Sequence, residues 1–220
     1  MQALRVAIRP DETVVDAGAG AGRYTAPLAT LARHVTAVEP SAGMRAALAN
    51  VVATRGLTNV SITEGSWQDA EVEPHDVVVC SHVLYFVPDA VPFIEKVDAK
   101  ARRACYIFLR VDARDTPLNP LWREVWGEER AREVGFLDLY NLLFSIGLLA
   151  NAQLTPPERG TRYIDLNDAV EQTRESLGLG PDDHQFDDRI RAFLDERLQP
   201  DGDRLAFLPF MQTAIVWWEK

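Results

Sequence analysis

The sequence is poor in the residues that form disulfide frameworks or zinc sites. Only two of its 220 residues are cysteine, Cys80 and Cys105, and neither belongs to a Cys-x-x-Cys pair or a cysteine–histidine cluster. Both fall in apolar stretches. This usage supports neither a disulfide framework nor a zinc site, and it favours a reduced, cytoplasmic setting.

Long apolar runs and clusters of basic residues are also missing. Nowhere do 18 apolar residues follow one another, and the first residues, with Arg5 and Arg9, contain no apolar signal-peptide core. We therefore expect neither a membrane segment nor a secretion signal. The formal net charge is -10 and no Lys/Arg run is visible. Because nucleic-acid-binding proteins use such runs on phosphates, DNA and RNA are not expected partners.

What the chain does contain is a glycine-rich segment, VVDAGAGAG, at residues 14–22. Its β-branched residues predict a buried strand, and its alternate glycines lack the Cβ atoms that would keep a ligand away from backbone N–H groups. Glu39 ends the next apolar stretch, so its carboxylate is expected at the carboxyl end of the neighbouring strand, where it can accept both hydroxyls of a ribose. Together these features predict a ligand that contains a nucleoside.

The spacing of the glycines separates two classes of nucleoside cofactor. A dinucleotide loop has glycine at its first, third and sixth positions, which here would need glycine at Arg23 or Thr25. The pattern Asp-x-Gly-x-Gly-x-Gly, followed by Glu-Pro-Ser at 39–41 and by Met44, instead resembles the first two motifs of class I S-adenosylmethionine-dependent methyltransferases. An NAD-dependent oxidoreductase and a tight turn without any ligand are the alternatives.

The rest of the sequence predicts the fold that this resemblance implies. Strand-like runs alternate with helical segments, as in a parallel sheet with helices on both faces; they lie at 13–16, 34–38, 60–63, 76–80 and 104–109. A sixth strand is expected at 150–154 and a last one at 214–218. The resemblance implies a Rossmann-like α/β fold with a seven-stranded, mostly parallel sheet, whose antiparallel last strand lies between the fifth and the sixth.

A chain of 220 residues suits one well-filled core, so a single domain over residues 1–220 is expected. A helical insertion is predicted at about 160–203, before the last strand. It would consist of two helices, at 168–177 and 183–198, separated by the break Gly-Leu-Gly-Pro. Several aspartates at the start of the second helix are interpreted as a solvated helix terminus, with a metal cluster as the alternative.

The resemblance assigns the methionine and ribose parts of S-adenosylmethionine to the first two strands. Gly18, Ala19 and Gly20 would bring their backbone close to these parts of the cofactor. Asp16 would lie beneath the loop near the amino group, or would only order the loop through backbone hydrogen bonds. Glu39 would bind the ribose, since a carboxylate that ends an apolar segment is costly to bury without a partner.

The adenine is assigned to residues that follow the second and third strands. Pro40 and Met44 would pack on the purine. Ser66 stands where many members of the family have an aspartate that accepts from the adenine amino group, so we expect this recognition from Ser66, from backbone groups or from Gln68. Trp67 would lie against the purine or, alternatively, plug the edge of the sheet.

Ser81 and His82 follow the fourth strand, beside the position that the resemblance gives to the sulfonium methyl group. Methyl transfer is an in-line displacement that depends chiefly on orientation and exclusion of water, so a base is optional. If the acceptor is a hydroxyl, His82 is the candidate general base, with a structural role as the alternative. Tyr85, Arg110 and Trp122 would line the acceptor side unless they serve only packing.

The expected activity is transfer of a methyl group from S-adenosylmethionine to a small-molecule acceptor, with a non-catalytic cofactor-binding module as the alternative. The Asn-Pro-Pro-Tyr type of loop, found in enzymes that methylate base amines, does not follow the fourth strand. About ten residues precede the first strand, where the family usually has helices that roof the cofactor. Either the chain is shortened there, or helices around 119–134 and 165–198 take over that role, or the second subunit of a homodimer does.

Overall fold

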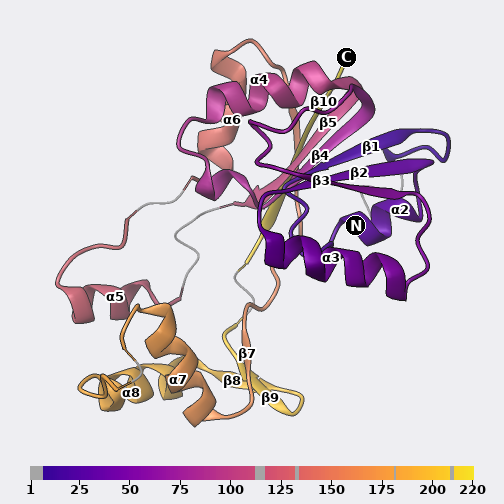
Figure 1. Ribbon diagram of the computed structural model, residues 1–220. Helices are drawn as coiled ribbons and strands as arrows, with labels where there is room; N and C mark the ends of the chain where they lie inside the picture. Colours follow the sequence, from indigo (N-terminus) through magenta and orange to yellow (C-terminus); the bar gives the residue numbers. More distant parts are fainter. Residues whose placement is uncertain (1–6, 112–116, 132–133, 181, 209–210) are drawn as a thin grey trace. The chain divides into compact units, whose positions relative to one another are not determined.

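The computed structural model describes residues 7–220 except 112–116, 132–133, 181 and 209–210, and they divide into two compact units (Figure 1). The first unit takes in Met1–Leu109, Phe136–Gln153 and Ala214–Lys220, and the second takes in Arg110–Gly135 and Leu154–Thr213. Each unit has a hydrophobic core of its own. The two units are described separately.

A seven-stranded sheet forms the centre of the first unit. Its strands are β1 (Thr13–Ala17), β2 (His34–Glu39), β3 (Val60–Glu64), β4 (His75–Ser81), β5 (Ala101–Arg110), β6 (Asn151–Leu154) and β10 (Thr213–Glu219). They follow the order β3-β2-β1-β4-β5-β10-β6. The Lys220 N–H donates to the Arg103 carbonyl over 2.8 Å, so the carboxyl end of β10 lies at the amino end of β5. This confirms the predicted sheet and its antiparallel strand between the fifth and the sixth.

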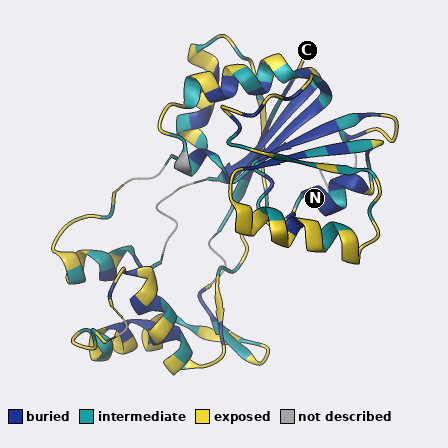
Figure 2. Cartoon of the chain, in the orientation of Figure 1, coloured by how far each residue is buried: buried dark blue, intermediate teal, exposed yellow. Residues whose placement is uncertain are grey.

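Helices cover both faces of this sheet. Helices α2 (Thr25–Ala29) and α3 (Ala42–Thr54) lie on one face, and α4 (Ala90–Lys100) and α6 (Phe136–Ser145) lie on the other (Figure 1). The central strands are buried from both sides, which Figure 2 shows as continuous dark blue. Runs of β-branched and other apolar residues therefore form the strands without alternation of polar positions, as parallel sheets require.

Helix starts and ends in this unit follow local turn chemistry. The Ser41 hydroxyl accepts from the Met44 N–H over 3.4 Å at the start of α3, and Gly56, with φ of +62°, follows its C-cap. Asp89 accepts from the Val91 N–H over 3.2 Å at the start of α4. These caps fix where each helix begins relative to the strand that precedes it.

The described residues of the second unit form three helices and a small sheet. The helices are α5 (Asn119–Trp126), α7 (Leu166–Ser176) and α8 (Asp187–Arg197). The predicted helical insertion at 160–203 is found here, although its second helix begins at Asp187 rather than at residue 183. The strands β7 (Arg162–Tyr163), β8 (Gln199–Asp201) and β9 (Arg204–Ala206) form an antiparallel sheet in the order β7-β9-β8 that the sequence did not predict. Strands this short contain too few residues for alternation to be visible.

Two further findings concern the described residues as a whole. They contain no group of three or more His, Cys, Asp or Glu side chains arranged to hold a metal ion. None of the helices formed by them is both long and apolar enough to cross a membrane.

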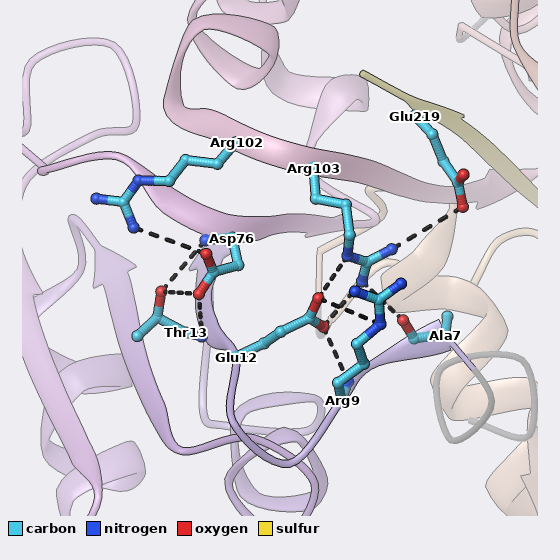
Figure 3. A network of polar contacts seen from close by, with 8 residues as sticks. All are labelled: Ala7, Arg9, Glu12, Thr13, Asp76, Arg102, Arg103 and Glu219. Atoms are coloured by element: carbon cyan, nitrogen blue, oxygen red, sulfur yellow. Dashed lines mark hydrogen bonds and ion pairs between the residues drawn. The ribbon is translucent and has the colours of Figure 1, made fainter.

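A charged network joins the amino ends of the central strands (Figure 3). Glu12 is buried; its carboxylate forms an ion pair with the Arg103 guanidinium on β5 and accepts from the Arg9 N–H over 2.8 Å. Asp76 accepts from both the N–H and the hydroxyl of Thr13, each over 2.8 Å, and these hydrogen bonds hold the pKa of Asp76 below its ordinary value. The network lies at the edge of the sheet opposite the glycine-rich loop, so we infer that it stabilises the folded protein.

Replacing Arg103 by alanine is expected to lower the free energy of unfolding by roughly 2 kcal/mol, because Glu12 would stay buried without its cation; Arg103 is partly exposed, so the loss stays below that of a fully buried pair. The matched control is Arg102→Ala: Arg102 is largely exposed and lies 3.7 Å from Asp76. It should cost less than ~1 kcal/mol. Urea unfolding measures both, and equal losses would contradict the assignment.

Candidate functional site

The glycine-rich loop between β1 and α2 is tied to the end of the neighbouring strand β2. Gly18, Gly20 and Gly22 have φ angles of +82°, +55° and +89°, in the region that favours glycine. The N–H groups of Gly18 and Ala19 both donate to the Val38 carbonyl over 2.9 Å. The loop is therefore held against β2 by the protein itself.

The three glycines of this loop face different surroundings. A Cβ atom on Gly18 would lie 2.3 Å from Val83 Cγ2, and one on Gly22 would lie 2.6 Å from Leu48 Cδ1. A Cβ on Gly20 would meet nothing within 4 Å. The close approach that the sequence suggested for a ligand is thus made at Gly18 and Gly22 by side chains of the protein, and open space is found at Gly20.

We expect Gly18→Ala to destabilise the protein by about 2–4 kcal/mol, since the new methyl group would overlap Val83 in addition to the strain of a positive φ. Gly20→Ala carries only the strain and should cost about 1–2 kcal/mol. Thermal and urea unfolding of the two variants compare them directly. If both lose the same stability, packing against Val83 does not explain the glycine at position 18.

Glu39, the last residue of β2, places a buried carboxylate beside Gly20. Its Oε2 accepts from the Gly20 N–H over 2.9 Å, and its Oε1 accepts from the Ser41 N–H over 2.8 Å. These hydrogen bonds offset the cost of burying the charge. Each carboxylate oxygen has a further lone pair, so Glu39 can still accept hydrogen bonds from a ligand.

Asp16 adds a second buried carboxyl group, on β1. It accepts from the Thr25 hydroxyl over 2.6 Å, so it is anchored by a side chain at the start of α2. Burial raises the pKa of Asp16 to about 6; the Thr25 hydrogen bond opposes this shift, and the charge of Glu39 adds to it. Two acidic groups at the ends of adjacent strands give this edge of the sheet a preference for cations.

Residues assigned to the adenine lie after β2 and β3. Pro40 is exposed, and Met44 is 49% exposed in the first turn of α3, so both can contact a ligand. The Ser66 hydroxyl donates to the Asp69 carboxylate over 2.6 Å and accepts from the Asp69 N–H over 3.2 Å. Sequence reasoning missed Asp69, although the pattern Ser-x-x-Asp is a known local capping signal. Gln68, next to it, is exposed.

Trp67 is buried, with 3% of its surface exposed. Its indole N–H donates to the Phe93 carbonyl over 3.3 Å, its ring lies 6.3 Å from that of Phe93, and the Lys96 ammonium lies 5.2 Å from its ring centre. Of the two alternatives for this residue, packing under α4 accounts for these contacts.

The end of β4 combines backbone strain with a buried polar atom. His82 has a φ of +59°, and no other described residue apart from glycine has a positive φ. Its N–H donates to the Phe108 carbonyl over 2.8 Å, and its Nδ1 lies 3.1 Å from the Tyr85 hydroxyl. The Ser81 hydroxyl is buried without a hydrogen-bond partner among the described residues. Strained residues beside unpaired polar atoms are typical of functional sites.

The candidate acceptor residues are divided between the two units. Tyr85 belongs to the first unit, together with His82. Arg110 and Trp122 belong to the second, where Arg110 lines a pocket and the Trp122 ring lies 5.2 Å from the guanidinium carbon of Arg130.

Comparison with known proteins agrees with the arrangement of the glycine-rich loop and Glu39 at the carboxyl ends of β1 and β2. Residues 14–117, which contain the glycine-rich loop and Glu39, match a family described as a methyltransferase domain. A protein of Haemophilus influenzae described as uncharacterized is 30% identical over 224 residues, covering 99% of this chain and 79% of that protein. Residues 14–117 therefore form a class I S-adenosylmethionine-dependent methyltransferase domain. S-adenosylmethionine is the methyl donor of this family.

Solved structures share the fold of this methyltransferase at low sequence identity. The YcgJ protein of Bacillus subtilis has a TM-score of 0.67 and 14% identity, covering 100% of this chain and 97% of that one. Magnesium protoporphyrin IX methyltransferase of Synechocystis, solved with bound S-adenosylhomocysteine, has a TM-score of 0.59 and 12% identity over 98% and 77% of the chains. An rRNA methylase of Streptococcus thermophilus has 0.52 and 13% over 98% and 91%. The acceptors named for the last two proteins differ, so the shared fold does not identify an acceptor.

Proposed function

We propose that the protein transfers the methyl group of S-adenosylmethionine to a small-molecule acceptor in the cytoplasm. The observation that carries this proposal is the buried Glu39 carboxylate, held by the Gly20 and Ser41 N–H groups next to the open space at Gly20. A carboxylate in this position can accept from both hydroxyls of a ribose. The net charge of -10 and the two free, buried cysteines support a small acceptor and a reducing compartment.

The residues present fit the other parts of this cofactor. Asp16 would attract the ammonium group of the methionine part, and the backbone from Gly18 to Gly20 would lie beside it. Pro40 and Met44 would pack on the purine. The Ser66–Asp69 pair would supply the acceptor for the adenine amino group, because Asp69 presents a carboxylate where Ser66 alone has only a hydroxyl.

The end of β4 would hold the acceptor. S-adenosylmethionine supplies a methyl group already activated by its sulfonium, so the protein has to align the acceptor and exclude water. The His82 imidazole, oriented by Tyr85, would take the proton at a ring nitrogen when the acceptor is a hydroxyl. The unpaired Ser81 hydroxyl would hydrogen-bond to the acceptor or to the cofactor.

Ligand-dependent thermal shifts followed by a transfer assay test this proposal. S-adenosylhomocysteine is expected to raise the melting temperature, and NAD is expected to leave it unchanged. S-adenosylmethionine with a labelled methyl group should then label at least one member of a metabolite panel, with His82→Ala as the variant that slows transfer to hydroxyl acceptors. Stabilisation by NAD alone would indicate an oxidoreductase, and cofactor binding without transfer to any member would indicate a non-catalytic module.

A further inference from the structure

The second unit contains a pocket of its own. It has a volume of about 490 Å³, and all of its lining residues belong to this unit. That volume lies in the usual range for small-molecule sites. The shape and chemistry of this pocket can therefore be read from the second unit alone.

The polar part of the pocket wall is basic. Arg110, at the end of β5, and Arg130, after α5, both line the pocket, together with the exposed residue Thr161. Guanidinium groups bind carboxylates and phosphates through two parallel hydrogen bonds. The wall therefore favours an anionic group.

Contacts with Trp122 hold Arg130 in place at this wall. The Arg130 guanidinium carbon lies 5.2 Å from the centre of the Trp122 ring, a distance typical of a cation–π interaction. Trp122 itself packs on the core of the unit, and its indole N–H is buried without an acceptor among the described residues. The aromatic face orients the cation before any ligand arrives, which reduces the entropy lost on binding.

The remaining wall is apolar. Leu118, Tyr163 and Phe207 are buried members of the unit's core, and they also line the pocket. Burial raises the pKa of the Tyr163 phenol, so this side chain stays uncharged near neutral pH. A ligand that leaves water for this surface gains most if its body is apolar.

We propose that this pocket binds a small organic anion, with a carboxylate or phosphate group on Arg110 and Arg130 and an apolar body against Leu118 and Phe207.

Titration of matched probes into the full-length protein tests the binding step without cofactor. The probes are 3-phenylpropanoate, its neutral amide 3-phenylpropanamide, and phenyl phosphate. At least one anionic probe should bind about tenfold more tightly than the amide, and Arg130→Gln and Arg110→Gln should each remove about that factor. Arg123→Gln is the control, since Arg123 is exposed and pairs with Glu129 at 3.2 Å outside the pocket. Equal binding of the amide, no binding of either anion, or wild-type binding by both arginine variants would overturn the proposal.

Thermal shifts with S-adenosylhomocysteine on the same variants separate this proposal from the proposed function. Arg130→Gln should keep the shift of the wild type, which also shows that the variant is folded. A wild-type shift in melting temperature without anion binding would contradict the anion site in this pocket but not the cofactor site. Anion binding without any shift would reject the cofactor site instead.

Discussion

Replacing Glu39 by alanine raises the Kd for S-adenosylhomocysteine at least ~100-fold, because two charge-assisted hydrogen bonds to the ribose, each worth ~1.5–3 kcal/mol, are lost. The glycine-rich loop also contributes to this loss of affinity. The Gly20 N–H and the Ser41 N–H both donate to this carboxylate, so its removal also frees the backbone that would face the cofactor. Isothermal titration of the purified variant measures the effect.

The matched control is Glu64→Ala. Glu64 is the register partner of Glu39 at the end of the adjacent strand β3, but its side chain is 77% exposed and pairs with Arg45 at 2.8 Å. It should bind S-adenosylhomocysteine as the wild type does. Near-ultraviolet circular dichroism checks that Glu39→Ala keeps its tertiary structure. Wild-type affinity in a folded Glu39→Ala variant would mean that the ribose is not bound at this carboxylate.

The second large effect is expected at Asp16, where stability and binding should change in opposite directions. Its pKa is raised from 3.8 to about 6 by burial, so ionising this carboxyl group costs more free energy in the folded protein than in the unfolded chain. The shift corresponds to roughly 3 kcal/mol. We expect Asp16→Asn to gain about 2 kcal/mol of stability at pH 7.5, since the neutral amide accepts a weaker hydrogen bond from Thr25.

The direction of the stability change follows from the protonation of Asp16. The folded Asp16 binds its proton more tightly than the unfolded one, so its contribution to stability is largest below pH 4 and is lost as pH rises from about 4 to about 6. The stability difference between Asp16→Asn and wild type should therefore be near zero at pH 4, grow through that window and stay constant above it. Urea unfolding at several pH values measures the difference. The control is Asp11→Asn, which removes an exposed carboxylate near the start of the chain; its stability at pH 7.5 should stay within about 0.5 kcal/mol of the wild type.

The same substitution should weaken the binding of S-adenosylhomocysteine. Without the Asp16 charge, the ammonium group of the methionine part loses its counter-ion, and the Kd for S-adenosylhomocysteine should rise about tenfold. An Asp16→Asn variant that is more stable and binds as tightly as wild type would show that this carboxyl group only anchors α2 through Thr25.

The parts of the fold that could be predicted are those in which burial dictates residue type along a whole element. A strand such as β4, covered on both faces, has to be a continuous apolar run, and it is visible without any structure. The binding role of Glu39 could be proposed for the same reason, because a carboxylate at the end of such an apolar run is costly to bury without a partner. Strands β7 to β9 have two or three residues each, and neither propensity nor alternation identifies elements of that length.

The candidate site was predictable in outline and less so in its contacts. The glycine pattern indicated a loop that approaches something closely, but only the structure distinguishes Val83 and Leu48, which lie against Gly18 and Gly22, from the open space at Gly20. Trp67 had two interpretations because a sequence does not show which face of a ring is buried. The pairing of Ser66 with Asp69 depends on the geometry of a turn, which only the structure shows.

A crystal structure of the protein with S-adenosylhomocysteine tests the central claim most directly. We expect both ribose hydroxyls within hydrogen-bonding distance of the Glu39 carboxylate, the ammonium group next to Asp16 and the purine against Met44. A ribose bound to any other group, or a cofactor seated away from the carboxyl ends of β1 and β2, would contradict it.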